Sequence, residues 1–294
     1  MPAQTSGGTA APGTPVEPYV DPARRDLARR KARRDALIAT VSTVVVFAVV
    51  VGVVASSSGW PIVRATFFSG EYAAQAFPAV LRAIWLNVRM FCIAEVFILV
   101  LGMTLALVRL STAPLLMPLR ILGTLYTDVF RGTPTLLVVL LLGFGVPALN
   151  LAGLPNDVVF WGTVALILSY TAYVAEVFRS AILSIHPSQR AAARSLGLSH
   201  WQSNRYVVLP QAVRRVIPPL LNDFVSLQKD TALVSVLGPV EALRAAQIIV
   251  YEKFNFTPYV VAALFFIALT IPLARLTDWL SAREQARRST GGAL

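Results

Sequence analysis

Cysteine and histidine are nearly missing from this sequence. Its 294 residues include one cysteine, Cys92, and two histidines. A single cysteine excludes an intramolecular disulfide, and residues this few and this scattered predict no metal centre. Cys92 lies inside an apolar run, where a cysteine is most often a small buried or lipid-facing residue.

The motifs of catalytic and nucleotide-binding proteins are also missing. The sequence has no GxxxxGK[ST] phosphate loop, no GxSxG turn and no HExxH motif. We therefore expect no catalysis and no cofactor on this chain. If transport here is driven by ATP, the nucleotide must be bound by another subunit.

Charge is scarce. Charged residues make up 14% of the chain and hydrophobic residues 56%, whereas soluble domains carry about 25% charged residues. The stretch 36–56 has no charged residue, and at about 1.5 Å per residue it can cross a bilayer core of roughly 30 Å. It starts too late and runs too long for a typical cleaved signal peptide, so we expect a retained membrane anchor.

The apolar runs predict an all-α membrane protein with about six transmembrane helices. The predicted spans are 36–56, 80–109, 120–149, 157–180, 215–238 and 258–280. The connecting parts are a disordered, basic N-terminus over 1–35, an extracytoplasmic connection over 57–79 and a basic tail over 281–294. Within the N-terminus, residues 1–22 have the composition of a disordered segment, while 23–35 could form a short basic helix.

Positive charge is unevenly placed. Lys and Arg outnumber Asp and Glu by 26 to 15, and they gather before residue 36, over 179–215 and in the tail. The positive-inside rule then places both termini and the 179–215 connection in the cytoplasm. A nucleic-acid patch is a less favoured interpretation, and the basic N-terminus is also suited to anionic lipid.

The fifth predicted span carries polar residues on one side. At 100° per residue, Asn222, Asp223, Ser226, Lys229 and Asp230 fall within about a third of the helix circumference. This pattern predicts a spanning helix whose polar stripe faces the bundle interior or an aqueous path. An interfacial helix lying on the membrane is the alternative.

The fourth predicted span has a similar face, formed by Ser169, Tyr173, Glu176 and Ser180. A carboxylate within a span is costly, so Glu176 is a candidate for a functional site. It is equally well explained by a structural ion pair with Arg179.

Residues 187–210 form a compact polar segment between two spans. Ser188 is suited to cap a helix, Gly197 to end it, and Ser199 with Gln202 to start a second helix as a capping box. Pro210 predicts a stop or kink. A DNA-binding helix-turn-helix is disfavoured because both ends are tied to spans, so we interpret the pair as a docking surface for a cytoplasmic protein.

This segment resembles the EAA loop of permeases in ATP-binding-cassette importers. Three alanines are followed, after three residues, by Gly197, and after nine more by Val-Val-Leu-Pro, which is the spacing of that loop. Ala191 stands in place of the usual Glu and Val207 in place of Ile. Counted from Ser188 as the cap, Ala191 is the third helical residue, where a Glu would complete a capping box. The resemblance implies ATPase-coupling roles for Ala191, Ala192, Ala193, Gly197, Trp201, Val207, Leu209 and Pro210.

Further stretches, among them YTDVFRGTP and YVAEVFRSAI, look like the polar amino acid branch of these permeases. The resemblance covers about residues 80–280 and implies a five-helix permease core in a bacterial plasma membrane, with the first helix as an addition. It implies an ATPase dimer that binds ATP and Mg²⁺, a second permease chain, an extracellular binding protein, and a substrate of the glutamate, glutamine, histidine, arginine, lysine or cystine class. The candidate path residues are Tyr173, Glu176, Asn222, Ser226, Lys229 and Asp230.

Two other functions remain open from the residues. A secondary amino acid transporter or channel without an ATPase would be expected to show inverted repeats, and no repeat is found. A membrane enzyme or scaffold would need a catalytic cluster or spans without polar stripes. Lys229 and Asp230 could bind the carboxylate and ammonium of an amino acid, or pair with neighbouring helices, which we favour.

Overall fold

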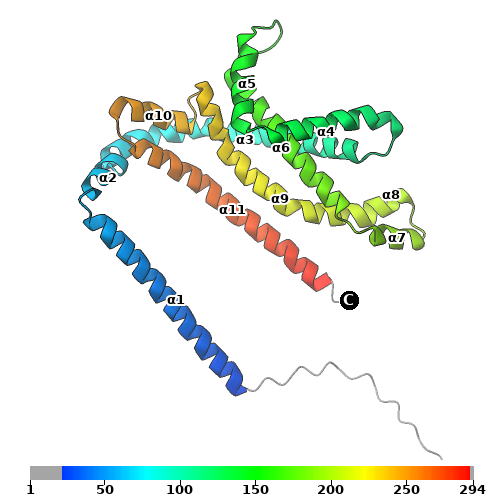
Figure 1. Cartoon of the computed structure of the whole chain (residues 1–294), viewed down its shortest axis with the longest axis horizontal. Coiled ribbons are helices and arrows are strands. Elements are labelled where there is room, and N and C mark those ends of the chain that lie inside the picture. The colour runs from blue at the N-terminus through cyan, green and yellow to red at the C-terminus, as the bar shows by residue number, and fades with distance from the viewer. Residues whose placement is uncertain (1–21, 292–294) are drawn as a thin grey trace, which may run out of the picture. The chain divides into compact units, whose positions relative to one another are not determined.

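The computed structural model describes residues 22–291, and every regular element in this range is helical, which confirms the all-α prediction there. The α-helices, shown in Figure 1, are α1 (Pro22–Ser56), α2 (Trp60–Phe67), α3 (Gly70–Leu110), α4 (Met117–Gly132), α5 (Thr135–Ala148), α6 (Val158–Leu183), α7 (Pro187–Ser195), α8 (His200–Ser203), α9 (Leu209–Asp230), α10 (Ala242–Lys253) and α11 (Thr257–Gly291). Three short helical segments with a different hydrogen-bond spacing join them: the 3₁₀ segments η1 (Pro114–Leu116) and η3 (Thr231–Leu237), and the π-helical η2 (Asn204–Val208).

The chain divides into two compact units, Met1–Ile62 and Val63–Leu294. In the first, α1 begins at Pro22, so residues 22–35 are helical; this agrees with the short basic helix expected over 23–35 and not with disorder over the whole of 1–35. The predicted disorder of residues 1–21 lies outside the described residues. All side chains from 30 to 59 are exposed, including valines and Phe47, as expected of a helix surrounded by lipid.

Four stretches are long and apolar enough to cross a membrane: Arg30–Ser56, Trp60–Leu110, Val158–Leu183 and Thr257–Trp279. Two further stretches pass only as bent pairs. α4 and α5 meet at 104°, and the run Trp201–Leu237 meets α10 at 48°. If each bent pair counts as one span, the predicted number of six is reached.

The segment predicted as the connection 57–79 is mostly helical, because α2 and the first turns of α3 lie in it. Contacts from a distant part of the chain hold this region. The Phe256 backbone N donates to the Thr66 carbonyl at 2.8 Å, and the Ser69 backbone N donates to Thr257 Oγ1 at 3.0 Å. Contacts between residues so far apart in the sequence produce no local pattern from which the structure of this segment could be predicted.

The third predicted span, 120–149, is broken at Thr133 and Pro134, between α4 and α5. A residue that precedes proline is pushed out of the helical region, and Thr133 has an extended backbone with ψ of 130°. α5 then packs against α6, and its Gly143 lies so close to Leu237 that there is no room for a Cβ.

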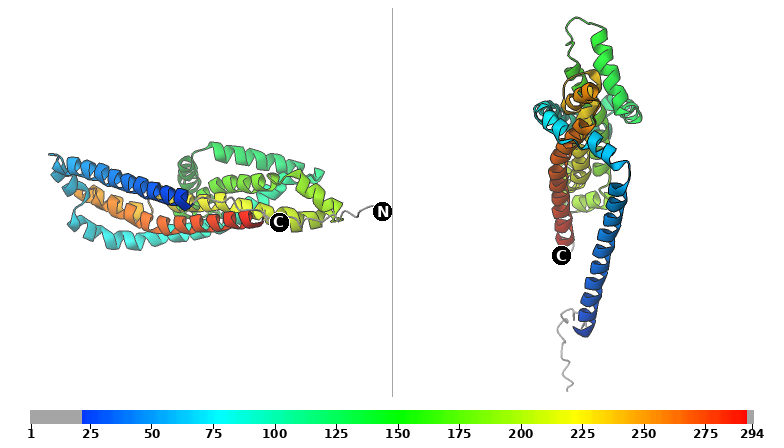
Figure 2. Two further views of the ribbon diagram at one scale, coloured as in Figure 1. Left: turned by 90° about the horizontal axis from the view of Figure 1, so that it is seen from below. Right: turned by 90° about the vertical axis from the view of Figure 1, so that its left-hand side faces the viewer.

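The second unit is built around α6. Figures 1 and 2 show α3 and α9 running alongside it, and α11 beside α3 and α9. The core includes Ile98 and Leu166, both almost fully buried. A Cβ on Gly102 would lie 2.7 Å from Val174 Cγ1, so the close approach of α3 to α6 depends on this glycine. The frame of α3, α6 and α9 holds most of the predicted site residues.

Candidate functional site

The helix pair predicted over 187–210 is present, with its first cap two residues earlier than expected. α7 begins at Pro187, and its N-cap is His186, whose Nδ1 accepts from the Ser188 backbone N at 3.2 Å. The prediction that Ser188 is the cap is wrong, since a histidine nitrogen takes the role of the hydroxyl. Ala191 is therefore the fifth helical residue, and a Glu there could not complete a capping box.

Gly197 ends α7 as predicted. Its φ is +83°, in the left-handed region that favours glycine. The Leu198 backbone N donates to the Ala193 carbonyl at 3.2 Å and the Gly197 N to the Arg194 carbonyl at 3.0 Å. These two bonds form a Schellman motif, which fixes the direction in which the chain leaves the helix.

The second helix start is also confirmed. The Gln202 backbone N donates to Ser199 Oγ at 3.2 Å, and the Ser199 N donates to Gln202 Oε1 at 2.8 Å, forming a reciprocal capping box. Pro210 does not stop the chain, however. α8 passes through the π-helical η2 into α9 without interruption, and Pro210 lies in the first turn of α9. The missing N–H of Pro210 is accommodated where the helix changes its hydrogen-bond spacing.

The loop has an inner and an outer side. Ala193 and Val208 are buried, and Val208 packs with Ile185 and Ala212 in a small core beneath the loop. On the outer side, Leu196 is 83% and Trp201 69% exposed. The other predicted coupling residues are exposed, apart from the partly buried Val207: they are Ala191, Ala192, Gly197, Leu209 and Pro210.

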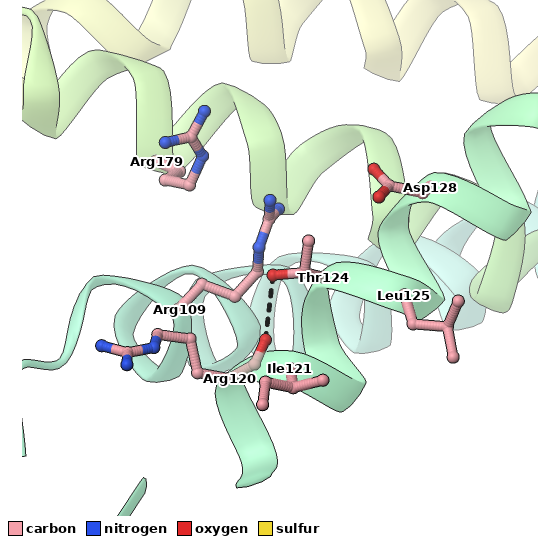
Figure 3. Close-up of a pocket in the computed structure, with 7 residues that line it drawn as sticks. All are labelled: Arg109, Arg120, Ile121, Thr124, Leu125, Asp128 and Arg179. Carbon is pink, nitrogen blue, oxygen red and sulfur yellow. Dashed lines mark hydrogen bonds between the residues drawn. The ribbon is translucent and has the colours of Figure 1, made fainter. Parts of the chain in front are cut away.

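An arginine-rich cavity lies where the ends of α3 and α6 meet α4 (Figure 3). Arg109 of α3, Arg120 of α4 and Arg179 of α6 all line it. Arg179 is on the last turns of α6, the helix that leads into α7. The cavity is therefore at the same end of the bundle as the helix pair.

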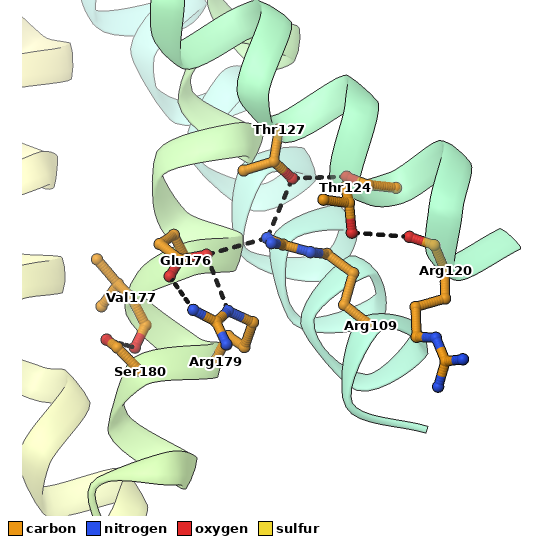
Figure 4. A network of polar contacts seen from close by, with 9 residues as sticks. Arg109, Arg120, Thr124, Thr127, Glu176, Val177, Arg179 and Ser180 are labelled. Atoms are coloured by element: carbon orange, nitrogen blue, oxygen red, sulfur yellow. Dashed lines mark hydrogen bonds and ion pairs between the residues drawn. The ribbon is translucent and has the colours of Figure 1, made fainter. Parts of the chain in front are cut away.

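Beside this cavity, Glu176 joins two of the three arginines (Figure 4). Its carboxylate lies 3.0 Å from Arg109 Nη1 and 2.5 Å from Arg179 Nη2. Arg109 also donates to the hydroxyl of Thr127, a fully buried residue of α4, at 3.2 Å. The predicted pair with Arg179 is thus present, and Glu176 in addition ties α6 to α3 and, through Arg109, to α4.

The polar stripe of α9 lies mostly outside the core of this chain, except at the partly buried Asp223, whose Oδ2 is buried and has no hydrogen-bond partner among the described residues. Asn222 and Lys229 are exposed and Ser226 is partly buried, whereas Leu227 and Gln228 are buried on the inner side. Gln228 Oε1 accepts from Thr270 Oγ1 of α11 at 2.7 Å. The exposed members of the stripe, Asn222 and Lys229, therefore border whatever lies outside this single chain.

Two tyrosines of α6 lie beside the end of this stripe. Tyr170 Oη donates to Asp230 Oδ2 at 2.8 Å, so Asp230 has a partner on a neighbouring helix, as favoured above. Tyr173 is 37% exposed, and its Oη donates to the Arg131 carbonyl at 3.3 Å. Within the part of the chain that the structure describes, no carboxylate lies within 4.0 Å of the Lys229 ammonium.

A comparison with protein families decides the identity. Residues 98–285 match the model of the binding-protein-dependent transport system inner membrane component. The chain belongs to this family. The match begins within α3 and includes the helix pair, both tyrosines and the whole of α9, so the candidate site residues all lie inside the family region.

Several amino-acid ABC transporter permeases are similar to this chain over most of its length. The probable glutamine ABC transporter permease protein GlnM of Bacillus subtilis is 36% identical over 63% of this chain and 83% of its own length. The probable amino-acid ABC transporter permease protein PatM of Vibrio harveyi is 33% identical over 74% of this chain and 96% of its own. A crystal structure of an amino acid ABC transporter with histidines matches with a TM-score of 0.66 and 30% identity, over 73% of this chain and 98% of that one.

This inner membrane component also has a buried polar cluster that the sequence analysis missed. Glu241, with no exposed surface, caps α10 by accepting from the Leu243 and Arg244 backbone N atoms at 3.0 and 2.7 Å. Asn87 of α3 donates to Glu241 Oε2 at 2.9 Å and to Thr231 Oγ1 at 3.1 Å. The cluster fixes α3, η3 and α10 together. The stretch Gly-Pro-Val-Glu is a helix-start pattern that could have revealed the cap, although not its partner on α3.

Proposed function

We propose that this chain is the membrane permease subunit of an ATP-driven importer for polar or charged amino acids. It forms part of the translocation path, and it couples this path to a cytoplasmic ATPase dimer through residues 187–210. The observation that carries the proposal is the rigid helix pair with large apolar side chains exposed at its outer side. Both termini lie in the cytoplasm in this arrangement, and the similarity to glutamine, arginine and other amino-acid permeases supports the substrate class.

The helix pair has the properties of a docking surface. A Schellman motif and a capping box fix its backbone, and the small core around Val208 holds it against the end of the bundle. Leu196 and Trp201 are exposed in a loop that faces water, where burying apolar surface gains about 25 cal/mol per Å². If a groove on the ATPase receives these two side chains, their burial contributes this free energy to the binding of the two proteins. Nearby arginines supply charge at the edge of the contact.

The polar side of α9 supports a path between two permease chains. Polar groups exposed to lipid are costly, so Asn222, Ser226 and Lys229 are stabilised when a second, identical or related chain encloses them. Lys229 and Asp230 carry the charges that complement the carboxylate and the ammonium of an amino acid. Tyr173 and Glu176 remain proposed residues of the path at its cytoplasmic end; within this chain they contact the Arg131 carbonyl of α4 and the Arg109 side chain of α3.

In this mechanism an extracellular binding protein delivers the amino acid to the outer end of the path. ATP and Mg²⁺ bind the partner ATPases, and closure of the ATPase dimer moves the helix pair. The movement shifts the permease between inward-facing and outward-facing states, so ATP biases a two-state element at a distance.

The test compares two glycines that both have a positive φ. Gly197 lies in the coupling loop at φ +83°, and Gly153 lies in the loop between α5 and α6 at φ +86°. A Gly197→Asp variant is expected to lose co-purification with its ATPase and uptake of labelled glutamine or arginine. The Gly153→Asp variant carries the same strain elsewhere and is expected to keep both.

Two results would contradict the proposal. Unchanged co-purification of the Gly197→Asp variant would show that the loop is not the docking surface. Uptake that continues after the ATPase is inactivated would instead identify a transporter that works without ATP.

A further inference from the structure

The arginine-rich cavity has a volume of about 500 Å³ and is bounded by three helices (Figure 3). Its lining residues include Arg109, Arg120 and Arg179, the carboxylate of Asp128, and the apolar side chains of Ile121 and Leu125. Volumes of about 300–1,000 Å³ are typical of small-molecule sites. The cavity is large enough for a polar group of several atoms.

The charges of the cavity do not cancel. Glu176 accepts from both Arg109 and Arg179, and Asp128 adds a second negative charge. Three guanidinium groups against two carboxylates leave a net charge of +1. Among the described residues, no carboxylate lies within 4.0 Å of the Arg120 guanidinium.

Arg120 has guanidinium N–H donors that can bind a further acceptor. One of its Nη atoms donates to the Ser111 carbonyl at 3.0 Å. A guanidinium has five N–H donors, so others remain for an anion, and their planar arrangement suits the paired oxygens of a phosphate. Its partly buried position and its bond to Ser111 hold the side chain in place beside the cavity.

The other wall of the cavity is apolar and exposed. Ile121 is 57% and Leu125 58% exposed, and both lie on α4, which forms a candidate span together with α5. The neighbouring residues Leu119 and Leu122 of α4 are exposed as well. An anionic phospholipid has a negatively charged headgroup next to apolar acyl chains. A cationic wall beside an apolar wall, at the end of the spans, complements this arrangement.

We propose that this cavity binds the phosphate diester headgroup of an anionic phospholipid from the cytoplasmic leaflet. Arg120 donates to the phosphate oxygens, the positive field of Arg109 and Arg179 adds to the attraction, and Ile121 and Leu125 contact the acyl chains. A phosphate diester such as that of phosphatidylglycerol carries one negative charge, which balances the net +1 of the site. Basic pockets between spans at the cytoplasmic side are suited to such headgroups.

The site rests on the proposed orientation of the spans, but its test does not use transport. The purified chain is placed in nanodiscs of phosphatidylcholine with phosphatidylglycerol, and the phosphatidylglycerol that it retains after extraction is measured by native mass spectrometry. We expect selective retention, which falls about fivefold in an Arg120→Gln variant, the change expected for one Lys or Arg charge near an anionic lipid. An Arg120→Lys variant is expected to recover most of the binding.

Arg275→Gln is the matched control, because Arg275 is 80% exposed on α11 and does not line the cavity. Leu125→Gln tests the apolar wall: it is expected to weaken retention of the lipid while leaving the arginines in place. Equal retention by Arg120→Gln and Arg275→Gln would overturn the proposal. Displacement of the lipid by millimolar inorganic phosphate would also overturn it, since the ligand would then be a free anion.

Discussion

A single substitution of Glu176 should show whether its carboxylate has a structural role or a direct role in transport. Its carboxylate is shared by Arg109, whose side chain is 10% exposed, and by Arg179, whose side chain is 31% exposed. In a Glu176→Gln variant, both arginines lose their counter-charge, and Arg109 keeps only neutral partners: the Thr127 hydroxyl and the glutamine carbonyl oxygen. We expect this variant to be clearly less stable than the native chain.

The size of the effect follows from burial. Removing one partner of a buried ion pair costs about 3–5 kcal/mol, whereas exposed pairs contribute about 0–1 kcal/mol. Glu176 is 20% exposed, and glutamine keeps one acceptor oxygen, so the loss lies between these limits, at about 2 kcal/mol. The control is Asp278→Asn, which breaks the pair of Asp278 with Arg275 at 4.0 Å, both more than 70% exposed, and should cost under about 0.5 kcal/mol.

The measurement is the free energy of unfolding in detergent, followed by circular dichroism during a denaturant titration. A double variant in which Arg109 and Glu176 are both replaced by leucine should recover at least half of the lost stability, because the more deeply buried charge of Arg109 is removed and only the 31% exposed Arg179 is left without its partner. Equal losses from Glu176→Gln and Asp278→Asn would refute the reasoning. Glu176 would then not hold the helices together, and a direct role in the path would be favoured.

Three further predictions concern other parts of the chain. Asn87→Ala removes a buried donor to Glu241 and should lower the free energy of unfolding by about 2 kcal/mol, measured in the same titration. With the native cysteine replaced by alanine, a cysteine at Ser226 should react with small aqueous thiol reagents and one at the buried Leu227 should not; equal labelling would place the path elsewhere. Deleting residues 1–21 should leave uptake unchanged, and a loss of uptake would show that this segment takes part in transport.

The parts of the coupling loop that were predictable depend on neighbouring residues. The Gly197 turn and the Ser199–Gln202 box use side chains and backbone groups within a few positions of one another, so their spacing was sufficient. The first cap failed because His186, a residue outside the usual capping set, accepts the hydrogen bond. The break at Pro134 was readable in principle, but the apolar run on both sides concealed it.

The tertiary contacts of the site were not predictable. Arg179 lies three residues from Glu176 and was named from the sequence, whereas Arg109 is 67 residues away and left no signal. The same is true of Asn87 and Glu241, which are 154 residues apart. The polar stripe of α9 was found from its periodicity, but periodicity gives the relative positions of side chains and not the direction in which they face.

The uninterrupted passage from α8 through η2 into α9 has a mechanical consequence. Trp201, at the outer side of the loop, and Ser226 are on one helical rod, about 37 Å apart at roughly 1.5 Å per residue. A load applied at Trp201 can rotate the rod as a whole, change the winding of the five π-helical residues Asn204–Val208, or bend α9 at Pro218 and Pro219, where backbone hydrogen bonds are missing. The stiffness of the helix at these two places then sets how much of the movement at the loop reaches the polar side chains of α9.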